Sequence, residues 1–216
     1  MSGPERGRAL ELYQTAAAGY DDAVSGRLVE RHRRRAVDRL WLAPGDSVLD
    51  VACGTGANFP LLAERVGPTG RIVGVDLSPD MLAIATERAR RMGSENVTLI
   101  EAAVEDAELP GDFEGALFSL THDVLQSKPA LDNVFAHVRR GGRVAAFGAK
   151  WAARWNLPVN LYVRRLSRRY VTTFEGLEAP WRNLAEYLDS LTVDEVAFGG
   201  AYIASGVASG RTTPAR

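Results

Sequence analysis

Short, mainly apolar runs and stretches with helical spacing alternate along the chain. The apolar runs cover residues 47–52, 71–75, 96–100, 115–120 and 143–148. A spacing of three or four positions, typical of one face of an α-helix, lies between them in residues 58–65, 80–92 and 129–139. Short, mainly apolar runs are typical of parallel strands that are buried on both faces. The pattern therefore predicts an α/β fold with helices on both faces of a sheet.

The two ends of the chain extend this pattern. Residues 27–41 predict an amphipathic helix with a run of arginines on its polar face. Near the other end we expect a helix over residues 180–188 and two strands, 193–198 and 201–207. Gly199-Gly200 lies between these strands and is typical of a hairpin turn. The chain has 216 residues, which fits a single domain.

The first apolar run ends in a glycine turn. Gly54-Thr55-Gly56 follows residues 47–52 and precedes the next expected helix. A strand, a glycine turn and a helix form the opening unit of a nucleotide-binding α/β fold, in which the ligand lies against bare backbone. Asp50 lies within the run, where a carboxylate must accept hydrogen bonds to offset its burial. Asp76 ends the second run, at the spacing from the glycines where an acid takes the hydroxyls of a ribose.

Other residues of this turn indicate which cofactors and which kinds of site are not expected. Phe59 stands where the dinucleotide pattern has its third glycine, which argues against a nicotinamide or flavin cofactor. Cys53 is the one cysteine of the chain, and we interpret it as a small residue that fills the loop, because no histidine is near it in sequence. Paired Cys or His spacings are absent from the sequence, so we expect no metal site.

These motifs resemble the class I S-adenosylmethionine-dependent methyltransferases. The resemblance is carried by Asp50-Val-Ala-Cys-Gly-Thr-Gly56 and by Gly74-Val-Asp-Leu-Ser-Pro-Asp-Met-Leu82, with Ala52 where the family has its first glycine. The sequence of these motifs is most similar to that of the ubiquinone/menaquinone-type methyltransferases and of small bacterial phospholipid N-methyltransferases. It covers residues 20–148 well and the remainder loosely. The resemblance implies a Rossmann-like sheet of seven strands, mostly parallel with an antiparallel last strand. It also implies S-adenosyl-L-methionine as cofactor, with S-adenosyl-L-homocysteine as product.

The resemblance also implies roles for individual residues. The glycines would lie under the methionine part of the cofactor, Asp76 would hold the ribose, and Leu77 or Met81 would cover the adenine. The family's acid after the third strand corresponds to Ala103, so we expect the polar contact from Glu105 or from backbone near Val104. The expected cofactor-binding residues are Asp50, Gly54, Gly56, Asp76, Leu77, Met81, Val104 and Glu105.

Two residues are candidates for catalysis. His122 follows the fourth apolar run, and residues at the carboxyl ends of parallel strands face the ligand crevice. His32 and His137 lie in expected helices, where solvent exposure is the default. Tyr20 lies in residues 1–26, which the resemblance implies are a lid; the alternative is a frayed terminus. Methyl transfer to an amine requires a free lone pair, so His122 or Tyr20 would accept the proton. A purely structural role for His122 stays open.

A basic segment follows the expected sheet core. Between Asp132 and Glu175 there is no acid and there are nine basic residues: Arg139, Arg140, Arg143, Lys150, Arg154, Arg164, Arg165, Arg168 and Arg169. A helix from Pro158 would place Val159, Tyr162, Val163, Leu166 and Tyr170 on one face and the arginines on the other. Such a helix, within a basic aromatic segment over residues 150–175, suits either a membrane interface or a cap on its own domain. We expect substrate contacts from Arg164, Arg165, Arg168 and Tyr170.

The expected architecture is one methyltransferase domain over residues 1–216, with a lid and helix in residues 1–40. Our main hypothesis is N-methylation of phosphatidylethanolamine, with arginines binding the lipid phosphate. The alternative is C- or O-methylation of a soluble or quinone-like small molecule, and a third reading is a non-catalytic cofactor-binding module. Nucleic acid is not an expected partner. The lone cysteine and the lack of a signal-peptide core predict a cytoplasmic protein, peripheral to the inner membrane surface under the main hypothesis. The oligomeric state stays open.

Overall fold

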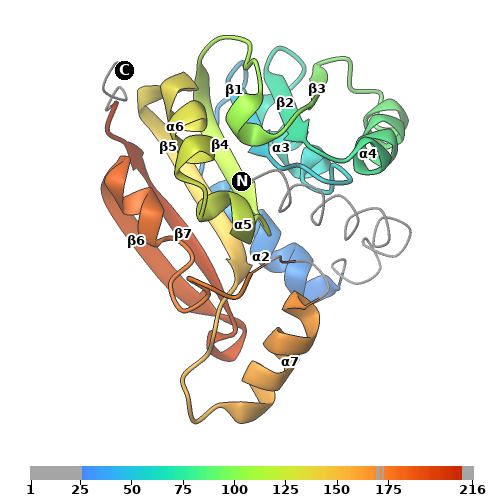
Figure 1. Ribbon diagram of the computed structural model, residues 1–216. Coiled ribbons are helices and arrows are strands. Elements are labelled where there is room, and N and C mark those ends of the chain that lie inside the picture. Colours follow the sequence, from blue (N-terminus) through green and yellow to red (C-terminus); the bar gives the residue numbers. More distant parts are fainter. Residues whose placement is uncertain (1–25, 169–170, 172, 211–216) are drawn as a thin grey trace.

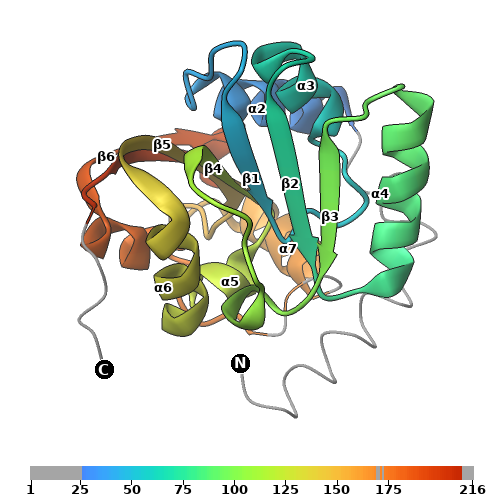
Figure 2. The same ribbon diagram turned by 90° about the horizontal axis from the view of Figure 1, so that it is seen from above.

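The computed structural model describes residues 26–168, 171 and 173–210, which form one sheet with helices on both faces (Figures 1 and 2). The strands are β1 (Ser47–Val51), β2 (Arg71–Asp76), β3 (Val97–Glu101), β4 (Phe113–Ser119), β5 (Val138–Ala149), β6 (Leu188–Val196) and β7 (Ala201–Ala208). The helices are α2 (Arg27–Asp38), α3 (Phe59–Val66), α4 (Pro79–Arg91), α5 (His122–Leu125), α6 (Lys128–His137) and α7 (Leu157–Ser167). Three 3₁₀ turns complete the described chain: η1 (Val104–Asp106), η2 (Arg182–Glu186) and η3 (Ala197–Gly199).

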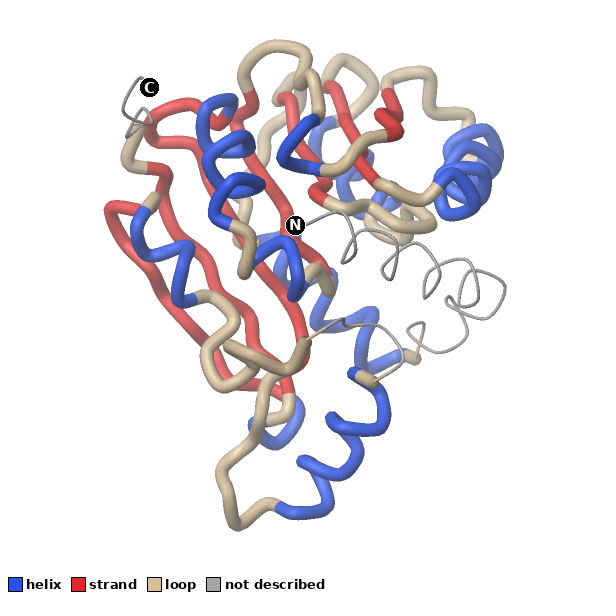
Figure 3. Tube along the Cα trace, viewed as in Figure 1, coloured by secondary structure: helices blue, strands red, loops and turns tan. Residues whose placement is uncertain are grey.

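The strand order of the sheet is β3-β2-β1-β4-β5-β7-β6. The first five strands pair in parallel, and β7 pairs antiparallel with both β5 and β6. The strands and the helices that flank them are distinguished by colour in Figure 3. The seven-stranded, mostly parallel sheet predicted from the sequence is therefore confirmed. The chain leaves β1 towards β2 on one side and returns beside β1 through β4 on the other. This reversal creates a crevice outside the carboxyl ends of β1 and β4, where ligands of such sheets bind.

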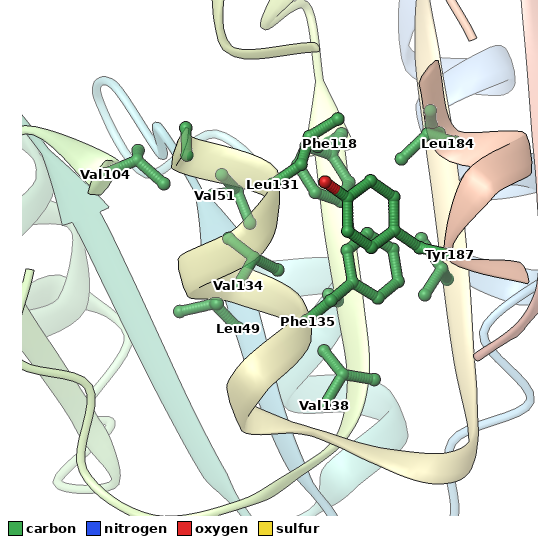
Figure 4. Packing of buried hydrophobic residues seen from close by; sticks show 14 of the residues in the cluster. Leu49, Val51, Val104, Phe118, Leu131, Val134, Phe135, Val138, Leu184 and Tyr187 are labelled. Carbon is green, nitrogen blue, oxygen red and sulfur yellow. The ribbon is translucent and has the colours of Figure 1, made fainter. Parts of the chain in front are cut away.

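Two apolar layers hold the helices to the sheet. On one face, α2, α3 and α4 bury side chains such as Val37 and Leu62 against the strands. On the other face, Leu131, Val134 and Phe135 of α6 pack over β1 and β4 (Figure 4). Tyr187 extends this second layer by stacking on Phe135, with ring centroids 4.6 Å apart. Burial of both faces explains why the strands are nearly continuous apolar runs.

Some expected elements differ from the observed ones. The helix expected over residues 180–188 was wrong: only the short 3₁₀ turn η2 forms, and β6 begins at Leu188. β6 ends at Val196, because residues 197–199 form η3 at the hairpin. β5 begins five residues before the expected strand, and its register with β4 shifts between Phe113 and Gly115. Gly141 has φ +79° within this stretch, as expected of a bulge that lengthens a strand.

Candidate cofactor and acceptor site

The glycine turn lies directly after β1, at the carboxyl end of the sheet. Gly54 has φ +55°, and a Cβ added there would meet no heavy atom of the described residues within 4 Å. Gly56 has φ +71°, but a Cβ there would lie 2.4 Å from the ring of Phe59. The two glycines therefore serve different needs, because Gly54 leaves space on the open side of the loop and Gly56 makes room for a core side chain.

Phe59 explains why the third glycine of the dinucleotide pattern is absent. Its ring is fully buried at the start of α3 and fills the space below the turn. A Cβ at Gly74 of β2 would also approach this ring, at 3.1 Å, and the Cys53 sulfur, at 2.8 Å. Cys53 is buried, and burial raises the pKa of its thiol well above the ordinary value. The thiol is therefore protonated at neutral pH, in agreement with a residue that fills the loop.

Asp76 connects the second strand to the glycine turn. Its carboxylate accepts hydrogen bonds from the backbone N–H groups of Gly54 at 2.8 Å and of Ser78 at 2.9 Å. Burial raises the pKa of Asp76, while these backbone hydrogen bonds act in the opposite direction. Each carboxylate oxygen has a further lone pair. Asp76 can therefore hold the turn in place and still accept hydrogen bonds from a diol.

Asp50 lies at the centre of the site and is fully buried. The Nδ2 group of Asn58 donates to both of its carboxylate oxygens, at 2.9 and 3.0 Å. Burial raises the pKa of Asp50 to about 7, although the bond from Asn58 and the Arg33 guanidinium lower it. The Oδ1 atom of Asn58 is buried, and residues 26–168, 171 and 173–210 offer it no hydrogen-bond partner. This atom offers an acceptor for a ligand N–H group beside the glycine turn.

The residues expected around an adenine lie along the neighbouring strand ends. Leu77 follows Asp76 and is half-buried, whereas Met81 is buried on the inner side of α4. The N–H group of Ala102 donates to the Asp76 carbonyl at 3.1 Å, which brings the end of β3 next to β2. Val104 and Glu105 follow in η1, and the Val104 carbonyl accepts a hydrogen bond from Asn133 at 2.7 Å. That carbonyl is therefore engaged within the protein.

His122 lies at the carboxyl end of β4 as expected, at the start of α5. Its Nε2 atom is 2.9 Å from the carbonyl oxygen of Glu175, so Nε2 carries the proton. Nδ1 and the hydroxyl of Thr121 are both buried and have no hydrogen-bond partner within the described part of the chain. Burial lowers the pKa of His122, so the ring is neutral at pH 7. His122 thus presents a free, basic Nδ1 lone pair within the crevice end of the sheet.

His32 departs from its sequence expectation. It was expected to be solvent-exposed on its helix, but its side chain is only 7 % exposed. Its ring lies against Phe147, with centroids 6.1 Å apart, because α2 packs on the sheet through this side as well as through its apolar stripe. Neighbouring Arg33 is also buried, whereas the sequence placed it with the polar face. A histidine amid arginines gave no signal of burial.

Of the expected substrate residues, Arg164 and Arg165 lie on α7, and Arg168 directly follows it. Arg164, Arg165 and Arg168 are exposed and form no ion pair in the described part of the chain. With Leu161 they line a surface groove of about 420 Å³. Tyr162 is 63 % exposed, whereas the sequence placed it on one face with Val163, which is buried. Tyr20 and Tyr170 lie outside the described residues.

The docked face of α7 explains the correction at Tyr162. Val163 is buried, and Val159 and Val163 approach Gly200 of the hairpin, where a Cβ would lie 2.6 Å from Val159. Asn160 fixes the preceding loop by accepting from the Ala152 N–H group at 2.9 Å. The inner stripe therefore follows positions 159, 163 and 167, and Tyr162 falls outside it.

Comparison with known proteins defines the class to which this site belongs. Residues 48–142 match the family model of the methyltransferase domain. These residues contain the glycine turn, Asp76 and His122. The sheet that contains them has the fold of the class I S-adenosylmethionine-dependent methyltransferases, as the sequence predicted. S-adenosylmethionine is the cofactor of this class.

Individual curated proteins and solved structures are similar to this chain. A ubiquinone/menaquinone biosynthesis C-methyltransferase of Ectopseudomonas mendocina is 31 % identical over 63 % of this chain and 56 % of its own length. The nocamycin O-methyltransferase of Saccharothrix syringae is 36 % identical over 61 % of this chain and 48 % of its own length. The chain therefore spans about half the length of the curated relatives it matches. A crystal structure of the geranyl diphosphate C-methyltransferase of Streptomyces coelicolor, with S-adenosyl-L-homocysteine, has a TM-score of 0.58 at 16 % identity, covering 84 % of this chain and 80 % of that one.

Two absences concern the described residues alone. Within residues 26–168, 171 and 173–210, no helix is both long and apolar enough to cross a membrane. The same residues contain no group of three or more His, Cys, Asp or Glu side chains that could hold a metal ion.

Proposed function

We propose that this chain is an S-adenosylmethionine-dependent methyltransferase that adds a methyl group to a carbon or oxygen atom of a small, oxygenated acceptor. The observation that carries the proposal is the pairing of a glycine turn held by Asp76 with the free Nδ1 lone pair of His122 at the same end of the sheet. The curated relatives described above are C- and O-methyltransferases, which favours these acceptor atoms over an amine.

The residues of the turn fit the cofactor. Gly54 leaves open space where a side chain would stand, so the methionine part can lie against its backbone. Asp76 would accept the ribose hydroxyls, and the unpartnered Oδ1 atom of Asn58 would accept from the amino group. Leu77 would border the adenine. When bound, S-adenosylmethionine supplies a methyl group on a sulfonium, and the leaving group is the neutral thioether S-adenosyl-L-homocysteine.

His122 would supply the base. A hydroxyl or enol becomes a good nucleophile when its proton is removed, and general bases of this kind contribute rate factors of about 10² to 10⁴. The Glu175 carbonyl holds the Nε2 proton and orients the ring, which leaves Nδ1 to take the proton of the acceptor. The lowered pKa of His122 keeps Nδ1 unprotonated and available at neutral pH.

The test uses labelled cofactor with two fractions of the source cells, a total lipid extract and an aqueous metabolite extract. We expect a labelled C- or O-methyl product, and we expect His122→Gln to reduce its rate about 10²-fold with unchanged cofactor affinity. His137→Gln is the matched control, because His137 is the last residue of α6, and its Nδ1 atom lies 2.9 Å from the Asn133 carbonyl oxygen of the same helix. Cofactor binding without turnover on either extract would instead support the non-catalytic module.

A second candidate is N-methylation of phosphatidylethanolamine at the inner membrane surface, and one observation favours it. The tip of the molecule around α7 carries exposed arginines, and large apolar side chains beside them are exposed too: Trp155, Leu157, Leu161, Tyr162 and Phe198. Phe198 joins this tip because its carbonyl accepts a hydrogen bond from Asn156 at 3.1 Å. Exposed aromatic rings beside arginines are typical of proteins that bind a lipid–water interface.

Vesicles test this second candidate directly. Under it, the protein sediments with vesicles of phosphatidylethanolamine and an anionic lipid at low ionic strength and is released at about 0.5 M salt. Replacing Arg164, Arg165 and Arg168 by Glu should abolish binding. Arg90→Glu with Arg91→Glu is the control, because these exposed arginines lie on α4, away from the tip. If the protein stays in the supernatant at low ionic strength, the membrane reading is wrong.

A further inference from the structure

His32 is a buried polar side chain that the fold does not satisfy. Its two ring nitrogens are both buried, and neither has a hydrogen-bond partner among the residues that the structure describes. Buried imidazole nitrogens without partners cost free energy, and such groups in a folded protein call for an explanation. A histidine kept only for packing would be replaced at lower cost by an apolar ring of the same size, because it lies against Phe147.

The position of His32 is at the ligand end of the sheet. Phe147 is near the carboxyl end of β5, and its carbonyl accepts a hydrogen bond from the Leu120 N–H group at 2.7 Å. Leu120 directly precedes Thr121 and His122. The rings of His32 and His122 therefore reach the same strand ends from α2 and α5, which cover opposite faces of the sheet (Figure 2).

The neighbour of His32 supports this placement. α2 packs in the same buried apolar cluster as Cys53 and Phe59 on either side of the glycine turn, and the guanidinium of Arg33 lowers the pKa of Asp50. The part of α2 that carries His32 thus lies between the cofactor loop after β1 and the end of β5. An acceptor bound beside the sulfonium would occupy this region of the crevice.

The chemistry of the ring defines what it can bind. Burial, with Arg35 and Arg31 nearby, lowers the pKa of His32, so the ring is neutral at pH 7. A neutral imidazole offers one N–H donor and one lone pair. It matches a group that both donates and accepts, such as a phenolic or enolic hydroxyl, or an adjacent hydroxyl and carbonyl.

We infer that His32 is a specificity-determining residue that hydrogen-bonds an oxygen of the methyl acceptor, and that the acceptor is a hydroxylated ring or enol. The inference rests on the proposed function, because it needs an acceptor in the crevice. It differs from the role of His122, since His32 recognises the acceptor and His122 removes its proton. Loss of His32 should therefore raise the acceptor concentration needed for half-maximal rate more than it lowers the maximal rate.

The experiment compares three variants with labelled cofactor and a dilution series of whichever extract gives product. His32→Phe keeps a buried ring and removes both nitrogens; we expect a melting temperature equal to or above that of the wild type and a half-saturating extract concentration about tenfold higher. His32→Gln keeps a donor and an acceptor and should recover part of the loss. His137→Phe is the matched control and should behave as the wild type.

Imidazole NMR of the wild type gives a second readout that needs no variant. Addition of the active extract should shift the ring resonances of His32 and leave those of His137 in place. Equal saturation curves for His32→Phe and wild type, or an unmoved His32 resonance while product forms, would overturn the inference and leave the proposed function standing. No labelled product from either extract with the wild type would overturn both.

Discussion

Alanine substitutions at the two glycines of the turn should separate the stability of the loop from ligand binding. Both residues have positive φ, which costs an L residue about 1–2 kcal/mol, while the loss of chain entropy in the unfolded state returns about 0.4–1 kcal/mol. Gly54→Ala adds a side chain with no atom within 4 Å, so we expect it to destabilise the protein by about 1 kcal/mol or less.

Gly56→Ala carries a further cost. Its Cβ would lie 2.4 Å from the buried ring of Phe59, and overpacking of this kind adds about 1–3 kcal/mol. We therefore expect a total loss of about 2–4 kcal/mol. The double variant Gly56→Ala/Phe59→Leu should recover part of it, because the smaller side chain relieves the clash.

Ligand binding should rank the two variants in the opposite order. The Cβ of Gly54→Ala points into the open space where the methionine part would lie, so cofactor affinity should fall at least about tenfold. Folded Gly56→Ala should retain more of its affinity, since its Cβ points to the core. Urea unfolding and calorimetry measure the two quantities. Equal stability losses in the two variants, or unaltered cofactor affinity in Gly54→Ala, would refute the reasoning.

Three further predictions concern stability. Ala52 has φ +49°, so Ala52→Gly should raise the free energy of unfolding by up to about 1 kcal/mol, which is measured as a higher urea midpoint. An unchanged or lower midpoint would show that no strain is stored there. Burial raises the pKa of Asp50 from 3.8 to about 7, so the stability that this carboxyl contributes is present below pH 4 and is lost as the pH rises through 7. The free energy of unfolding should fall by an amount on the order of 4 kcal/mol, and Asp50→Asn should flatten the pH profile of the urea midpoint over this window. Tyr187→Phe removes a hydroxyl that donates to Asp132 at 2.7 Å and should lower the unfolding free energy by about 1–2 kcal/mol, while Asp132→Asn in the same background should add little.

The sequence predicted the parts of the fold that depend on local pattern. The parallel strands could be predicted from apolar runs, because helices cover both faces of the sheet and the strands are therefore apolar on both sides. The glycine turn and the acid at Asp76 were found from spacing, and the structure joins them through the Gly54 hydrogen bond. The role of Gly56 was not visible, because its need for space comes from Phe59, which the motif treats only as a missing glycine.

The parts that depend on tertiary contacts were not predictable. His32 lies in a run of arginines, and only the docking of α2 on Phe147 shows that its side chain is buried. Tyr162 fits the apolar stripe by helical spacing, but the docking of α7 at Gly200 selects a different stripe. Residues 180–188 were expected to form a helix, yet only the short 3₁₀ turn η2 forms within them, and their last residue, Leu188, begins β6, which pairs with β7. In each case the partner is distant in sequence.

Calorimetric titration with S-adenosyl-L-methionine and S-adenosyl-L-homocysteine tests the central claim most directly, that the turn after β1 and the carboxylate of Asp76 form the cofactor site. The account predicts saturable binding of both compounds by the wild type and a loss of at least about tenfold in Asp76→Asn, with Asp106→Asn, an exposed acid after β3, unchanged. No heat of binding with the wild type, or equal affinity in Asp76→Asn, would contradict it.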